Sequence, residues 1–260
     1  MHPETQYLNI LSRALGSPDR DTRNDNGSRS FFGASMEFDM ADGFPLLTTK
    51  RVPFRHVALE LDWFLSGNTN AKWLEDRGVN IWKQWGHPET REMGPIYGAQ
   101  FRGRDDQLKE VISCLKFAPH SRRHVISLWN PEDLYDMALP PCHGIAIQFY
   151  VEHDGRLSLS MYQRSADVFL GLPFNIASYS LMLHYVAESV NRVPGRFLWF
   201  GGDIHLYSNH IEAAIEQLSR NPRPFPQISI DGEFDLVPTY ENVSLSGYDP
   251  HPTIKAEVSA

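Results

Sequence analysis

Hydrophobic residues recur at spacings of three and four in several segments, as expected of helices with one buried face. From Thr5 to Ala14 this stripe is Tyr7, Ile10, Leu11 and Ala14. The same spacing predicts further helices at about Arg55–Leu65, Gln107–Phe117, Ile176–Asn191 and Asn209–Leu218.

Other segments have the character of strands. Gly144 to Val151 is apolar and β-branched, Asp154-Gly155 is a turn signal, and apolar residues alternate with polar ones from Leu157 to Met161. Phe197 to Phe200 predicts another strand, whereas Arg20 to Ser30 is polar and predicts a loop. Helices with antiparallel pairing predict an α+β fold, an antiparallel or mixed sheet with flanking helices.

Composition limits the organisation and the class of protein. The chain has 260 residues, 42% of them hydrophobic, without a linker or repeat, so we expect one catalytic domain, residues 1–260. A formal charge of −8 argues against nucleic acid as a partner. The N-terminus lacks the features of a signal peptide, and no apolar run reaches membrane-spanning length. Two cysteines fit free thiols in a reducing compartment, so a cytoplasmic location is expected.

One of those cysteines, Cys142, precedes the predicted hairpin and is a candidate nucleophile. The alternative is a buried structural thiol, since free cysteine is among the most buried residue types. His143 should not be its base, because neighbours in an extended segment point to opposite faces. A thiolate here therefore needs positive charge from elsewhere, and arginines are the obvious supply.

Four arginines have unusual settings. Arg164 ends a predicted strand and precedes Ser165, Arg122 and Arg123 are adjacent before an apolar stretch, and Arg23 lies in the polar loop. Each taken alone fits solvated surface charge. Together with Ser165 they would form a phosphate clamp, because guanidinium groups match phosphate oxygens bidentately.

Three further residue types leave alternatives open. Asn175, at the start of a predicted helix, suits an N-cap or a ligand for the N3–H and O4 groups of uracil. Trp82 and Trp85 suit core packing or stacking on a flat heterocycle. His205 and His210 have no third ligand at suitable spacing, so we expect no metal.

The stretch from Arg164 to Tyr179 resembles the signature of thymidylate synthases, and the resemblance extends over nearly the whole chain. The other matching segments are 42–51, 94–98, Ser121-Arg122-Arg123, Pro141-Cys142-His143, 202–210 and 247–252.

The resemblance implies a homodimeric enzyme whose sheets pack face to face, with dUMP as substrate and 5,10-methylene-tetrahydrofolate as co-substrate. Arg122 and Arg123 would serve the partner's phosphate site. The implied catalytic residues are Cys142, Glu60, Tyr97, Arg164, Asn175 and Asp203. The implied dUMP ligands are Arg23, Arg122, Arg123, Gln163, Arg164, Ser165, Asp167, Asn175, His205 and Tyr207. The implied folate contacts are Lys50, Ile81, Trp82, Leu139, Asp167, Gly171, Phe174 and Ser259.

Several positions depart from the family pattern. Pro53 stands where a folate-contacting His is usual, Gly144 replaces a usual Ala, Ala166 a usual Cys, and Ile204 a usual Thr. The loop after Arg23 and the C-terminal tail also differ. Several of these positions lie near the folate or its closing tail in the family.

Three functions follow as hypotheses. A thymidylate synthase reduces the C5 methylene with hydride from the folate, and the retained tail length and Trp82 favour this reaction because enclosure excludes water. A pyrimidine-nucleotide hydroxymethylase would add water to the same methylene. A non-catalytic nucleotide- or RNA-binding relative would be expected to lack the nucleophile or the base, yet Cys142 and Glu60 are present.

Overall fold

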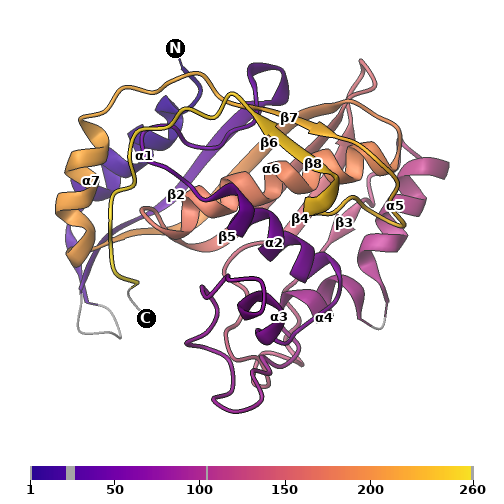
Figure 1. Cartoon of the computed structure of the whole chain (residues 1–260), viewed down its shortest axis with the longest axis horizontal. Coiled ribbons are helices and arrows are strands. Elements are labelled where there is room, and N and C mark those ends of the chain that lie inside the picture. Colours follow the sequence, from indigo (N-terminus) through magenta and orange to yellow (C-terminus); the bar gives the residue numbers. More distant parts are fainter. Residues whose placement is uncertain (1, 22–26, 104, 259–260) are drawn as a thin grey trace.

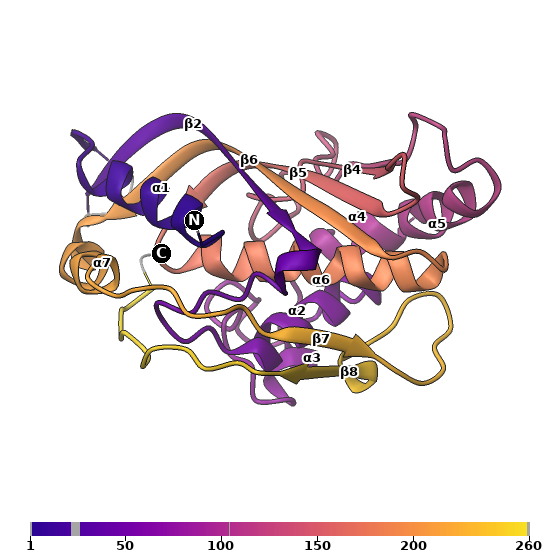
Figure 2. The same ribbon diagram turned by 90° about the horizontal axis from the view of Figure 1, so that it is seen from above.

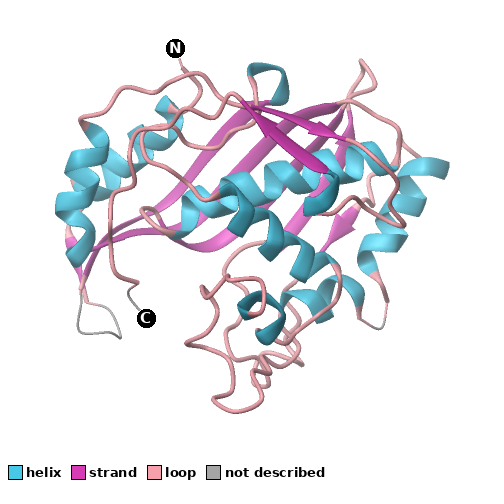
Figure 3. Ribbon diagram, in the orientation of Figure 1, coloured by secondary structure: helices cyan, strands magenta, loops and turns pink. Residues whose placement is uncertain are grey.

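A six-stranded sheet forms the centre of the molecule, with strand order β1-β2-β6-β5-β4-β3 (Figures 1 and 3). The computed structural model describes residues 2–21, 27–103 and 105–258. Strands β5 and β6 run parallel and the other neighbours run antiparallel. The strands are β1 Asp19–Arg20, β2 Ser28–Asp39, β3 Val125–Ile126, β4 Ala146–Val151, β5 Leu157–Asp167 and β6 Pro194–Tyr207, with β7 Gln227–Ile230 and β8 Val243–Ser246 forming a separate ribbon. The mixed sheet and its helices confirm the α+β prediction.

One face of the sheet is covered by α6 (Gly171–Ser189), and α2 (Phe54–Leu65) packs on the far side of α6 (Figure 2). Because α6 lies between two layers, it is buried almost all round, as expected of a helix that is apolar on every face. The other helices are α1 Thr5–Leu15, α3 Lys72–Glu75, α4 Tyr97–Arg102, α5 Gln107–Phe117 and α7 Ile211–Leu218, with 3-10 turns at Met40–Asp42, Ser208–His210 and Tyr240–Asn242. None of the helices in the described ranges has both the length and the apolar character of a membrane span.

Strand β2 is the main feature that the hydrophobic pattern does not predict. It is paired with β6 along its length, from Ser28 opposite Tyr207 to Asp39 opposite Arg196. The predicted loop from Arg20 to Ser30 is wrong at both ends, since Arg20 ends β1 and Ser28 begins β2. The side chains of β2 are a mixture of buried, half-buried and exposed, so backbone pairing with β6 sets its extent more than any alternation does.

Strand β6 is longer than predicted: Phe197 to Phe200 is only part of a 14-residue strand. The strand continues through Gly201 and Gly202, although glycine inside a strand usually weakens it and so predicts that the strand ends there. Both glycines are required by close packing, because a Cβ on Gly201 would overlap the ring of Trp199 and one on Gly202 would lie 2.8 Å from the Arg164 carbonyl oxygen.

Helix α6 begins five residues earlier than predicted, at Gly171. Asn175 therefore lies inside the helix, and the N-cap interpretation of Asn175 is wrong. Asp167 contributes at this end of the helix instead, since its Oδ1 accepts hydrogen bonds from the backbone N–H groups of Phe169 and Leu170 at 2.9 and 3.0 Å. Likewise, β5 continues past Arg164 to Asp167, and the helix predicted from Asn209 begins at Ile211 after a 3-10 turn.

Candidate active site

Cys142 lies in the segment that leads into β4 and is fixed to β5 by its own backbone. Its carbonyl oxygen accepts from the N–H of Arg164 at 2.9 Å and of Ser165 at 3.4 Å. Its N–H donates to the Tyr97 hydroxyl at 3.0 Å, and its Sγ lies 3.6 Å from the same oxygen. The residue as a whole is half-buried, whereas the thiol itself is desolvated by the surrounding side chains.

The charge environment of Cys142 has opposing parts. Desolvation raises the pKa of the thiol, while the Tyr97 hydrogen bond and the positive charge of Arg164 lower it. The Arg164 guanidinium is held near Cys142 by the carbonyl oxygens of Pro141, 2.8 Å from Nε, and Pro140, 3.1 Å from Nη2. Among the described residues its Nη1 has no partner, which leaves donors free for a ligand.

His143 contacts two tyrosines, and the backbone at Cys142 and His143 is bent, not extended as predicted. Its Nδ1 lies 2.9 Å from the Tyr179 hydroxyl, and its ring stacks on Tyr97 with centroids 4.6 Å apart. Burial lowers the pKa of His143 to about 3, so the imidazole is neutral at physiological pH.

Glu60 is a buried carboxyl group on α2. It accepts a hydrogen bond from the indole nitrogen of Trp82 at 2.7 Å. Burial raises the pKa of Glu60 to about 7, and the Trp82 hydrogen bond opposes that rise. Trp82 also packs against Phe64 and Tyr97, so it serves both as a core residue and as a polar partner. The Glu60 charge acts on Cys142, which places both groups in one electrostatic site.

A relay of three side chains orients Asn175. Trp199 on β6 donates its indole N–H to Gln163 Oε1 at 3.0 Å, and Gln163 Nε2 donates to Asn175 Oδ1 at 2.9 Å. The indole is only a donor, so it determines which end of the Gln163 amide faces Asn175. The Asn175 Oδ1 therefore faces Gln163, and its amide NH2 group is directed elsewhere.

Asp203 is not in contact with Cys142 among the described residues. Its Oδ2 pairs with Arg20 at 2.7 Å, and its Oδ1 lies 3.3 Å from Nδ1 of His205. The hydrogen bond to His205 lowers the pKa of Asp203. The His205 and Tyr207 rings make an edge-to-face contact at 5.0 Å, so the two predicted sugar ligands lie together at the end of β6.

The predicted phosphate clamp is only partly assembled within one chain. Arg164 and Ser165 are adjacent to Cys142, whereas Arg122 and Arg123 are exposed just before β3, the edge strand. Within the described ranges, neither of those two guanidinium groups has a hydrogen bond or ion pair. Arg23 lies outside the described residues.

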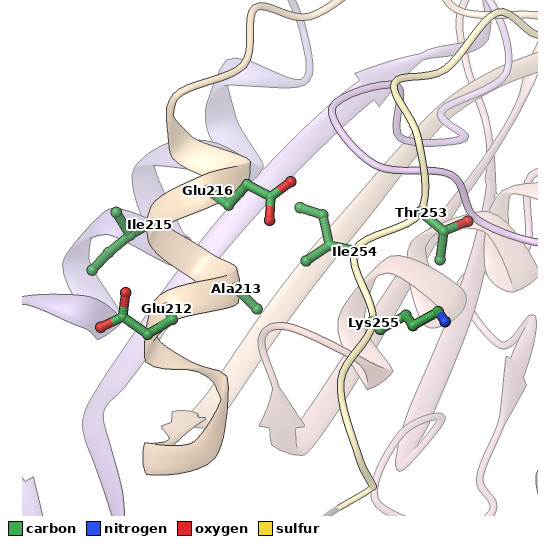
Figure 4. Close-up of a pocket in the computed structure, with 7 residues that line it drawn as sticks. All are labelled: Glu212, Ala213, Ile215, Glu216, Thr253, Ile254 and Lys255. Atoms are coloured by element: carbon green, nitrogen blue, oxygen red, sulfur yellow. The ribbon is translucent and has the colours of Figure 1, made fainter.

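A groove of about 620 Å³ lies between the start of α6 and the C-terminal tail. It is lined by Lys50, Arg51, Val52, Pro53, Leu170, Pro173, Phe174 and residues 253–257. Ile81 and Leu139 are half-buried against the core, Gly171 begins α6, and Ser259 lies outside the described residues. Figure 4 shows the other side of the tail, a pocket between the tail and α7, where Ile254 points toward α7 while Lys255 points away from that helix. A hydrogen bond from His210 Nε2 to the Glu257 carbonyl oxygen, 2.7 Å, anchors the tail.

Lys50 is turned inward at this groove. Its Nζ donates to the Phe169 carbonyl oxygen and lies 3.6 Å above the centroid of the Phe169 ring. Burial lowers the pKa of Lys50 to about 7, and the negative charge of Asp167 opposes the shift. Across the described part of the chain, no three His, Cys, Asp or Glu side chains group as a metal ion needs.

Sequence reasoning missed two residues that organise the site, Tyr179 and Trp199. Tyr179 falls on the buried stripe of a helix and Trp199 within an apolar strand, so both fit ordinary core packing. The only available signal was their polar atoms, because a buried hydroxyl or indole N–H normally has a hydrogen-bond partner.

The chain matches the model of a known protein family. The model described as thymidylate synthase matches residues 5–260, which is nearly the whole chain. The chain belongs to the thymidylate synthase family, whose enzymes transfer a one-carbon unit to dUMP.

Proposed function

We propose that this protein is a thymidylate synthase that methylates dUMP at C5, with 5,10-methylene-tetrahydrofolate as co-substrate. The observation that carries the proposal is the position of Cys142. Its thiol contacts Tyr97 and lies in the field of Arg164 and Glu60, and its backbone is hydrogen-bonded to the strand that holds Gln163. This arrangement suits a nucleophile that adds to an electron-poor ring.

The chemistry follows from the electronic structure of uracil. Carbon C5 is a weak nucleophile, but addition of the Cys142 thiolate to C6 moves electrons to O4 and makes C5 an enolate carbon. C5 then attacks the folate methylene, loses its proton, and expels tetrahydrofolate to leave an exocyclic methylene. Hydride from that tetrahydrofolate reduces the methylene to methyl, dihydrofolate forms, and the thiolate leaves C6.

Glu60 suits the proton relay in these steps. A carboxyl group with a pKa of about 7 can both give and take a proton at neutral pH. Trp82 holds one of its oxygens, so the other remains for water or the base. Tyr97 supports the nucleophile through the Cys142 N–H and Sγ contacts.

Asn175 supports uracil as the base. With its Oδ1 toward Gln163, its NH2 group can donate to O4, where negative charge develops, and the second lone pair of Oδ1 can accept from N3–H. A flip to suit cytosine would place the NH2 group against the NH2 of Gln163. That amide cannot turn in response, because Trp199 is only a donor.

The phosphate and sugar sites would be completed by two subunits. Arg164 Nη1 and Ser165 are near Cys142, and His205 with Tyr207 suits the 3′-hydroxyl. Arg122 and Arg123 of the partner, together with Arg23, would supply the remaining charge. Asp203 would act by orienting His205, with which it is in contact, and Asp167 by shaping the start of α6.

The uncovered face of the sheet supports a homodimer with sheets face to face. Tyr162 on β5 is opposite Phe200 on β6, and they are 38% and 45% exposed. Tyr150 on β4 and Phe32 on β2 are 50% and 80% exposed. Aromatic side chains on adjacent strands of a face without helices suit a protein interface.

The groove between α6 and the tail would hold the folate, with Phe174 and Leu170 against its rings and Lys50, Arg51 and Lys255 near its carboxylates. Enclosure by the tail and by buried Trp82 favours hydride transfer over addition of water. The alternative is dUMP 5-hydroxymethylase, in which water adds to the same methylene. Pro53, in the wall of the groove, is a departure that concerns the folate and not the nucleotide.

One incubation tests the proposal. The protein is mixed with dUMP and methylene-tetrahydrofolate, and both product mass and dihydrofolate are measured. A methylated nucleotide with equimolar dihydrofolate is the expected result. A hydroxymethyl product without dihydrofolate would favour the hydroxymethylase. Binding of dUMP without turnover would favour the third hypothesis, a non-catalytic nucleotide-binding relative.

A further inference from the structure

Tyr179 is a buried residue of α6 to which the proposed chemistry gives no role. It is 3% exposed, and its hydroxyl lies 2.9 Å from Nδ1 of His143, the residue next to the nucleophile. The two rings meet edge to face at 5.5 Å, while Tyr97 stacks on a face of the His143 ring with centroids 4.6 Å apart. The imidazole is thus held by contacts with two tyrosines.

Gly144 makes room for this contact. Its φ is +68°, a conformation that L side chains rarely adopt, and a Cβ there would overlap the Tyr179 hydroxyl oxygen and lie 2.6 Å from Leu128 Cδ1. The resemblance leads one to expect Ala at this position. In this chain, the side chains of Leu128 and Tyr179 fill the space that an Ala methyl would need.

The direction of the hydrogen bond follows from counting donors and acceptors. His143 Nδ1 is the only partner of the Tyr179 hydroxyl within the described residues. If Nδ1 carried the proton and donated it, the phenol proton would be buried without an acceptor, which is costly. If the phenol donates, its proton and the Nδ1 lone pair are both satisfied, and the imidazole proton is on Nε2.

We propose that Tyr179 is a positioning residue that donates to Nδ1 of His143, so that His143 presents Nε2–H to the site, and that Gly144 provides the space for this contact. The inference rests on the proposed function for its catalytic consequence. A neutral imidazole with a fixed Nε2–H is a donor of constant direction, able to hold a water at pyrimidine O4 as charge develops there.

The first test reads the tautomer directly, without substrate. The ring nitrogens of His143 are observed by 15N NMR in histidine-labelled protein, with His143→Gln to assign the signals. Wild type should show protonated Nε2 and a hydrogen-bonded, unprotonated Nδ1 at neutral pH. In Tyr179→Phe the Nδ1 signal should move to the position of an acceptor without a partner. A protonated Nδ1 in the wild type would overturn the proposal.

The second test measures the consequence for turnover. Tyr179→Phe should lower kcat for dUMP about tenfold, less than the hundredfold or more that loss of a direct oxyanion donor costs, with KM changed less than twofold. The matched control is Tyr185→Phe, on the same helix and equally buried, whose hydroxyl lies beside Asp62. Equal kcat for wild type and Tyr179→Phe would refute the positioning role.

Gly144→Ala tests the space requirement. It should shift the Nδ1 signal as Tyr179→Phe does, and adding Tyr179→Phe to it should lower kcat no further, because both changes remove one contact. Additive losses would show that Gly144 acts elsewhere. If Gly144→Ala does not fold, the Tyr179→Phe measurements still decide the main claim. Absence of dUMP turnover in wild type would defeat the proposed function but leave the tautomer measurement interpretable.

Discussion

Cys142 is placed where a weakly acidic thiol can still become a nucleophile. Burial raises the pKa of the thiol, so the thiolate is a minor species in the free protein, and Tyr97 and Arg164 offset only part of that effect. Loss of the sulfur should therefore remove covalent catalysis without removing the nucleotide site, whose remaining ligands are independent of it.

Cys142→Ser should lower kcat by at least about a thousandfold, since the hydroxyl is far less ionised than a thiol at neutral pH. The dissociation constant for dUMP, measured by calorimetry, should change only a few-fold. Cys114→Ser, at the other free thiol, is the control. A Cys142→Ser variant with a substantial fraction of wild-type turnover would exclude the covalent mechanism.

The raised pKa of Glu60 should make the free energy of unfolding depend on pH, because ionising this buried carboxyl group destabilises the folded state. Its pKa rises from 4.5 to about 7 on folding, so the folded state binds the proton more tightly than the unfolded state. Below pH 4.5 both states are protonated and Glu60 has no effect. As pH rises from 4.5 to 7 the folded state loses stability, by about 3 kcal/mol at most, and the loss is constant above pH 7.

Glu60→Gln should therefore be more stable than wild type above pH 7 and lose that advantage at pH 4.5, while its turnover falls. Denaturant unfolding at a series of pH values measures the difference. Burial also raises the pKa of Asp62 to about 7, so Asp62→Asn is the matched control for stability without loss of turnover. Parallel stability curves for wild type and Glu60→Gln would contradict the prediction.

Asn175 should determine the choice of base. Wild type should prefer dUMP over dCMP by orders of magnitude in kcat/KM, because its amide is oriented by Gln163. Asn175→Asp should reduce or reverse that preference, since a protonated carboxyl can donate to N3 of cytosine. Competition between the two nucleotides measures it. An unchanged preference in the variant would leave the substrate standing but remove Asn175 from its recognition.

At the scale of elements, the C-terminal tail forms one wall of the proposed folate groove and is anchored by His210. His210→Phe keeps the ring contacts with Phe169 and Tyr207 but removes the hydrogen bond to Glu257. A bond worth about 1 kcal/mol predicts a roughly fivefold higher KM for the folate.

The affinity for dUMP should be unaffected by His210→Phe. The control is His251→Phe. The His251 ring is hydrogen-bonded to the Asn221 carbonyl oxygen, and neither residue lines the groove, so this variant should leave both constants unchanged. An unaltered folate KM in His210→Phe would mean that the tail does not need this anchor.

At the scale of the whole molecule, Arg122 and Arg123 are exposed at the edge strand, which suits charges that a second subunit uses. Inactive Cys142→Ser and Arg123→Ala proteins, mixed and allowed to exchange, would form heterodimers with one intact site each. Statistical exchange puts about half the molecules in heterodimers, so activity should approach about a quarter of wild type. No recovery, with exchange shown by native mass spectrometry, would count against a shared site.

The sequence by itself determined the elements whose side chains repeat with a clear period. The buried stripe of α1 and the helix from Gln107 to Phe117 were predicted to within a residue, because burial of one face dictates such spacing. It also identified the candidates for the reactive groups, since Cys142, Glu60 and Arg164 carry chemistry that few other side chains can supply.

The tertiary structure alone decided the rest. β2 is a strand because β6 pairs with it, and Asn175 is inside α6 because that helix extends five residues further between two layers. The pKa of Glu60, the orientation of Asn175 and the tyrosine at His143 depend on groups 22, 12 and 36 residues away. Local periodicity reports which residues are buried, whereas burial partners and hydrogen-bond directions arise only when distant segments meet.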